Sequence, residues 1–161
     1  MNNIESVLKK LKSITWMWAK SDIEEILCSL GATLVEMISG RWTCRLSEGA
    51  SLSVYFQDDR VEFVEITIAV FQNPHLLSEV EYEDKVDEFF EKFEETVLLG
   101  KRVLGLPLFN DGAAAEGFPD DQDAVWLALW NVKNARLMIQ QTHEDKELPF
   151  RLCIVIAPLA C

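Results

Sequence analysis

The stretch SLSVYFQDDRVEFVEITIAV, residues 51–70, decides the fold class of this chain. Apolar residues alternate with polar ones on both sides of Asp58-Asp59, and many of them are β-branched or aromatic. Such alternation is typical of strands that bury one face, and two consecutive Asp residues suit a tight turn. The stretch therefore predicts an antiparallel β-hairpin.

Two more segments of the same kind precede this hairpin. TLVEMI begins at Thr33 and RWTCRL begins at Arg41, and the turn-forming pairs Ser39-Gly40 and Glu48-Gly49 bound them. Strands joined by such short connections usually pair with their neighbours in sequence. The four segments together predict an antiparallel meander.

Helical spacing appears on both sides of the predicted meander. After Ser78, apolar residues recur on one helical face, which predicts a long helix over 79–104 that covers the sheet. These residues are Val86, Phe89, Phe90, Phe93 and Val97. The first dozen residues predict an amphipathic helix, and the capping-box pattern Ser21-Asp22-Ile23-Glu24 predicts a second short helix that Gly31 closes.

The last third of the chain allows two interpretations. AVWLALW and NVKNARLMIQQTH are compatible with one helix, but the alternation at Leu137 and Ile139 and the turn residue Asn134 favour a hairpin. FRLCIVIA, after Pro149, predicts a strand that is central or covered on both faces. At 161 residues the chain fits one domain. We predict an α+β fold, with an antiparallel β-sheet of about seven strands, two N-terminal helices and one long helix packed on the sheet.

The charge and the cysteines restrict the class of partner and the compartment. The net charge of −12 disfavours nucleic acid and anionic membranes, which need Lys and Arg from the protein. No apolar run is long enough for a signal peptide or a spanning helix, so we expect a cytoplasmic protein. Cys28, Cys44, Cys153 and Cys161 are far apart, in segments that look buried, and are expected to be reduced core thiols. Most of the five Trp are expected in the core as well.

Motifs for catalysis or for a cofactor are absent from the sequence. His75 and His143 lie in turn-like settings without partners at ligand spacing, and a solvated side chain is expected for both. The run Asp120-Asp121-Gln122-Asp123 lacks the glycine and the distant Glu of a calcium loop. We therefore expect no metal, no cofactor and no enzymatic activity. A carboxylate pair assembled in space stays open as a lower alternative.

The acidic residues are segregated along the chain. Residues 1–56 hold six acidic and six basic residues, residues 78–95 hold nine acidic and two basic ones, and residues 110–123 hold five acidic and none. The acidic side of the long helix is expected to be its solvated face. The loop within 110–123, which contains Gly112 and Gly117, is either an arm that binds a partner or a mobile surface loop.

The whole-chain profile resembles the immunity proteins of bacterial polymorphic toxin systems, including those of Rhs and type VI secretion effectors. The resemblance lies in two leading helices, the strands GRWTCRL and SLSVYF, the acidic helix, and the closing HEDKELPFRLCIVIAP. It implies a protein that binds a cognate toxin domain with a basic cleft and blocks it. We expect the toxin-binding residues to be Asp111, Glu116, Phe118, Asp120, Asp121 and Asp123. An acidic secretion chaperone for an effector protein is the alternative.

Overall fold

The computed structural model describes residues 2–143 and 147–160. Three α-helices occur in this part of the chain: α1 (Asn2–Ser13), α2 (Ile23–Ser29) and α3 (Glu79–Leu104). The strands of the first half are β1 (Thr33–Ile38), β2 (Arg41–Arg45), β3 (Ser51–Gln57) and β4 (Arg60–Phe71). Those of the second half are β5 (Phe109–Gly112), β6 (Trp126–Val132), β7 (Ala135–Thr142) and β8 (Phe150–Ala157). Short 3-10 helices lie at Lys20–Asp22 and Pro74–Leu76.

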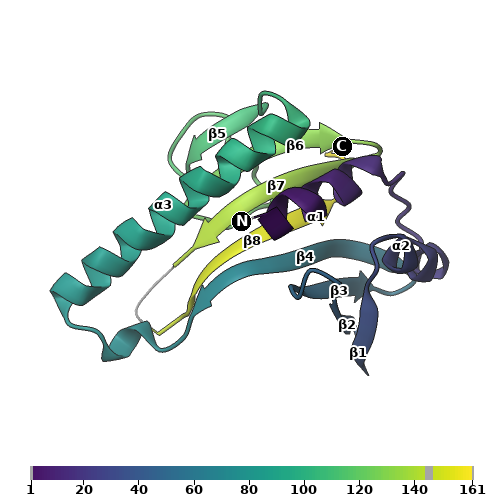
Figure 1. Ribbon diagram of the computed structural model, residues 1–161, viewed down its shortest axis with the longest axis horizontal. Coiled ribbons are helices and arrows are strands. Elements are labelled where there is room, and N and C mark those ends of the chain that lie inside the picture. The colour runs from purple at the N-terminus through teal and green to yellow at the C-terminus, as the bar shows by residue number, and fades with distance from the viewer. Residues whose placement is uncertain (1, 144–146, 161) are drawn as a thin grey trace.

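The strands form a single antiparallel sheet in the order β1-β2-β3-β4-β8-β7-β6-β5 (Figure 1). The meander β1 to β4 and the hairpin of β6 and β7 are confirmed, and β8 lies at the centre between them. The predicted number of about seven strands differs from the observed eight because β5 has only four residues, FNDG, which resemble a turn. The predicted α+β class, with a long helix on the sheet, is confirmed.

Helix α3 covers the half of the sheet that contains β6, β7 and β8 (Figure 1). Ser78 caps it: its hydroxyl accepts from the Glu81 amide at 3.2 Å, and the Glu81 carboxylate accepts from the Ser78 amide at 3.0 Å. Phe89 and Phe93 are buried against the sheet as predicted, whereas Phe90 is only half-buried. The apolar spacing of the helix and its cap therefore fix its position over the core.

The N-terminal segment packs on the same face of the sheet as α3. Leu8 and Leu11 of α1 are buried, and the helix lies beside α3 (Figure 1). The predicted capping box of the second helix is wrong, because Ser21 belongs to the 3-10 helix and Asp22 precedes α2 without a side-chain cap. Gly31 follows the end of α2 with a φ of 71°, a conformation that favours glycine.

Apolar clusters lie on both faces of the sheet. The main cluster joins α1, α2 and α3 to the sheet and contains Trp16, Trp18, Trp42 and Trp130, so the expectation of core tryptophans is confirmed for these four. The second cluster is smaller and lies on the opposite face. It comprises Leu127, Met138, Cys153, Val155 and Ala157, with Phe63, Phe109, Phe118 and Leu129 packed against them. Strand β8 is thus covered on both faces. In the described part of the chain, no helix is long and apolar enough to cross a membrane.

Candidate functional site

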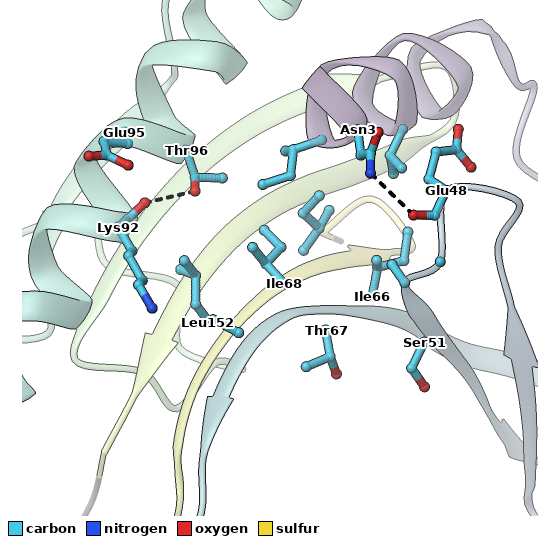
Figure 2. A pocket seen from close by; sticks show the side chains of 16 residues that line it. Asn3, Glu48, Ser51, Ile66, Thr67, Ile68, Lys92, Glu95, Thr96 and Leu152 are labelled. Atoms are coloured by element: carbon cyan, nitrogen blue, oxygen red, sulfur yellow. Dashed lines mark hydrogen bonds between the residues drawn. The ribbon is translucent and has the colours of Figure 1, made fainter. Parts of the chain in front are cut away.

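An open cleft lies between α1 and α3, with the sheet as its floor (Figure 2). Its floor consists of Ile66 and Ile68 from β4 and Leu152 and Ile154 from β8. The cleft encloses about 530 Å³, which lies within the usual range of ligand-sized pockets. An apolar floor of this size can accept an apolar side chain of a partner or a small apolar molecule.

Polar groups surround the mouth of the cleft rather than its floor. Lys92, Glu95 and Thr96 of α3 lie on one side, and Asn3 and Glu48 on the other (Figure 2). The Thr96 hydroxyl donates to the Lys92 carbonyl at 2.7 Å, so its donor is already used within the helix. Of the charged groups of α3 at this mouth, Lys92 pairs with Glu88 at 3.7 Å, and the Glu95 carboxylate points away from the floor of the cleft (Figure 2).

Glu48 attaches the β2–β3 turn to α1 and so closes one end of the cleft. Its carboxylate lies 2.8 Å from the Lys10 ammonium and accepts at 3.0 Å from the hydroxyls of both Ser6 and Ser47. Burial raises the pKa of this carboxyl, but the hydrogen bonds of Lys10, Ser6, Ser47 and its own backbone outweigh burial and lower the pKa to about 2. The turn is therefore held by an ionised group at neutral pH.

The solvent side of α3 carries a row of carboxylates, which we call the acidic ridge. It consists of Glu79, Glu81, Glu83, Asp84, Asp87, Glu88, Glu91, Glu94 and Glu95, all exposed. Among the described residues, only Glu88 of the ridge forms an ion pair, with Lys85 at 2.6 Å and Lys92 at 3.7 Å. Glu95 belongs to both the ridge and the cleft mouth, so the apolar floor and the acidic surface adjoin.

The six residues predicted to bind a toxin do not form one surface. Asp111 belongs to β5 and lines a hollow beside α3 together with Glu94 and Lys101. Glu116 is exposed in a turn, and Asp120 and Asp123 are exposed as well. Phe118 and Asp121 instead attach their segment to the sheet, so this segment is not the loose arm that its glycines suggested.

Packing and charge hold the segment in place. Phe118 is half-buried, with its ring 5.8 Å from that of Phe109 in an edge-to-face contact. Asp121 accepts two hydrogen bonds from Arg136, at 2.9 and 2.6 Å, and Arg136 also donates to the Pro158 carbonyl at 2.9 Å. The bonds from Arg136 lower the pKa of Asp121 more than burial raises it. Asp121 thus attaches its segment to β7, although its side chain stays 58% exposed.

Asp121 and Asp123 line a polar hollow on the face of the sheet opposite α3. The hollow encloses about 520 Å³, and Arg136 and Gln140 form part of it. Gln140 donates to the Gln122 side chain at 2.6 Å. Sequence reasoning missed Arg136 and Gln140, although polar residues within the otherwise apolar strand ARLMIQQT were a signal for them.

The histidines and cysteines depart in part from expectation. His75 is exposed, as predicted, but His143 is half-buried: its ring stacks on Phe150 at 5.0 Å, and burial lowers its pKa. Cys44 and Cys153 are buried, whereas Cys28 is exposed, so the core prediction is wrong for Cys28, and Cys161 lies outside the described residues. Within residues 2–143 and 147–160, no group of three His, Cys, Asp or Glu side chains is placed to hold a metal ion.

Comparisons with known proteins leave the family open. No protein-family model matches the chain, and no curated protein matches it. Among solved structures, it is similar to a DUF4309 family protein (YjgB) from Bacillus subtilis, with a TM-score of 0.37 and 8% identity over 98% of this chain and 95% of that one. A TM-score this low does not establish a common fold, so the site is interpreted from its own residues.

Proposed function

We propose that this chain is a non-catalytic immunity protein that binds a cognate toxin domain in the cytoplasm of the producing cell and neutralises it. The single observation that carries the proposal is the acidic ridge, whose largely unpaired carboxylates adjoin the apolar cleft at Glu95. An acidic surface next to an apolar cleft suits a partner that presents both basic and apolar groups.

The acidic ridge lowers the stability of α3, because its carboxylates repel one another. Asp84, Asp87, Glu91 and Glu94 recur at steps of three and four residues, so neighbouring carboxylates face each other on the helix surface. Like charges at this spacing destabilise a helix by about 0.2–0.5 kcal/mol per pair. A basic partner removes this repulsion when it binds, which supports a role for the ridge in recognition rather than in folding.

The proposed mode of inhibition combines the two parts of the site. The ridge attracts the basic cleft of the toxin and raises the rate of encounter, and an apolar side chain of the toxin enters the cleft between α1 and α3. Asp111, which shares a hollow with Glu94, extends the acidic surface to β5. Glu116, Asp120 and Asp123 stay candidates for a second contact.

The test is to identify the gene immediately upstream of the one for this chain and, if it encodes a secreted protein with a small C-terminal domain, to co-express that domain with this chain. The ridge variant carries Asp87→Asn, Glu91→Gln and Glu94→Gln. Its matched control removes three exposed carboxylates elsewhere, by Glu24→Gln, Glu25→Gln and Asp58→Asn. Growth protection, and the association rate of the purified pair at low and high salt, are then measured.

We expect the ridge variant to associate about tenfold more slowly than the wild type at low salt, with the difference lost at high salt, because screening removes long-range attraction. The control is expected to behave as the wild type. Equal association rates and equal protection for all three proteins would contradict the role of the ridge. Binding of an unfolded segment of an effector, without protection from a toxin, would favour the chaperone alternative.

A further inference from the structure

Strand β1 forms one edge of the sheet and is exposed along its whole length. It pairs with β2 on one side, and no described element pairs with its other side (Figure 1). Four of its six residues are large and apolar, with exposed fractions of 48% for Leu34, 61% for Val35, 55% for Met37 and 47% for Ile38. An edge strand presents unpaired backbone N–H and C=O groups, so an apolar edge is a template for another strand.

The apolar residues of β1 lie on both faces of the sheet. Leu34 is opposite Cys44 and Met37 is opposite Trp42, and both of these β2 residues are buried in the main core. Ile38 is opposite Arg41, on the other face. The core layer therefore continues onto β1 and ends there in solvent.

Little on β1 prevents a further strand from pairing. Natural edge strands are protected by charges, proline, bulges or short length. Strand β1 carries one charge, Glu36, and one register shift, between Leu34 and Glu36. The opposite edge, β5, has only four residues, including Asp111 and Gly112. The two edges thus differ, and β1 is the one suited to pairing.

The charge distribution indicates what covers β1. Two molecules of net charge −12 repel each other over most of their surface. The part of the chain that contains β1, residues 1–56, holds equal numbers of acidic and basic residues. At the edge itself, β1 carries one acidic residue, Glu36, and the neighbouring β2 carries two basic ones, Arg41 and Arg45, so a second, equally acidic copy can approach closely here.

We propose that β1 is the interface of a homodimer, in which the β1 strands of two copies pair antiparallel about a twofold axis and join the two sheets. Such an interface needs only one self-complementary strand. Leu34 and Met37 are an odd number of residues apart, yet both lie on the core face, because the register shift between Leu34 and Glu36 interrupts the alternation of side chains. An antiparallel pairing can therefore place Leu34 of one copy opposite Met37 of the other on that face. The same pairing places Thr33 opposite Ile38 on the outer face.

The test measures the mass in solution over a range of micromolar concentrations, with no toxin present. We expect the wild type to have twice the monomer mass of 18.4 kDa. The variant Leu34→Lys/Met37→Lys places like charges opposite each other and is expected to weaken the dimer at least tenfold. The control Leu76→Lys/Leu106→Lys changes two exposed leucines outside β1 and is expected to stay dimeric. An unchanged far-ultraviolet circular dichroism spectrum and cooperative thermal unfolding show that each lysine variant remains folded; loss of the dimer by itself lowers the melting temperature.

Cross-linking tests the register. In a Cys28→Ser/Cys44→Ala/Cys161→Ser background, which removes the cysteine opposite Leu34 in the same chain, mild oxidation of a mixture of Leu34→Cys and Met37→Cys chains is expected to link unlike chains preferentially. A monomeric wild type, open-ended oligomers, or a Leu34→Lys/Met37→Lys variant that stays dimeric and folded would overturn the proposal. A monomer that requires β1 to bind a toxin would assign this edge to a different protein. The measurement does not involve the acidic ridge, so its outcome is independent of the proposed function.

Discussion

Glu48 makes the stability of the protein depend on pH, and replacing it measures how strongly the β2–β3 turn is attached to α1. Its carboxylate receives hydrogen bonds from α1 and from its own turn, and its pKa lies at about 2 rather than the ordinary 4.5. A carboxyl whose pKa falls on folding stabilises the protein above its unfolded pKa, and this contribution is lost as the pH falls through the folded pKa. For Glu48 the contribution is complete at pH 7 and declines between about pH 5 and pH 2.

The size of the effect follows from the same contacts. Lowering the pKa from 4.5 to about 2 corresponds to at most about 3 kcal/mol. The Glu48 side chain is 9% exposed, but that of Lys10 is 35% exposed, so solvent screens part of their attraction. We therefore expect Glu48→Gln to lower the free energy of unfolding at pH 7 by about 1–2 kcal/mol.

Urea unfolding of the wild type and of Glu48→Gln at pH 7 and pH 3.5 is the measurement. The difference between the two proteins should shrink at the lower pH, because the wild-type carboxyl begins to lose its advantage there. Glu25→Gln, on the exposed side of α2, controls for the loss of one surface charge. A difference for Glu48→Gln that is the same at both pH values would refute the assignment of the effect to an ionised Glu48.

Three further substitutions test how α3 and the acidic segment are held. Phe93→Ala should cost about 3–5 kcal/mol in urea unfolding, because Phe93 is buried between α3 and the sheet; a loss below about 1 kcal/mol would contradict this packing. Gly100→Ala should lower the free energy of unfolding by about 1–2 kcal/mol, although alanine favours a helix more than glycine does, because the new Cβ would lie 2.7 Å from Cη2 of Trp130. A second substitution, Trp130→Phe, should remove this clash and restore part of the lost stability. Asp121→Asn should lower the free energy of unfolding by about 1–2 kcal/mol, because it removes one of the two charge-assisted hydrogen bonds to the buried Arg136. The loss stays modest because the Asp121 carboxylate is partly in solvent, and an unchanged melting temperature would show that the pair is weak.

Most secondary-structure elements could be predicted from local pattern. The alternation in 51–70 and the apolar spacing after Ser78 repeat over ten or more residues, so each signal is strong. The α2 cap could not be predicted in the same way, because the Ser21 to Glu24 pattern is short and the chain forms a 3-10 turn there instead. Strand β5 is too short to show a period, and it exists because β6 provides a pairing partner.

The candidate cleft could not be predicted, because its floor and walls come from distant parts of the chain. Ile4, Ile66, Thr96 and Leu152 have no sequence relationship that would bring them together. The acidic loop within residues 110–123 is the opposite case, because its composition is visible in the sequence but its contacts are not. Its charges are plain in the sequence, but whether Asp121 is free depends on Arg136 in a strand that follows it.

The sequence by itself determined the periods of the strands and helices, the capped start of α3 and the concentration of acidic residues on that helix, because these depend on neighbours within a few residues. The tertiary structure decided which of those groups remain available. It placed Asp121 in an ion pair with Arg136 and half-buried His143 against Phe150. It left β1 exposed at the edge of the sheet, although the residues of β1 resemble those of a buried strand. The physical reason is that the burial and the ion pairs of a side chain depend on which distant segments pack against it in the folded chain. The order of the strands in the sheet decides which segments these are.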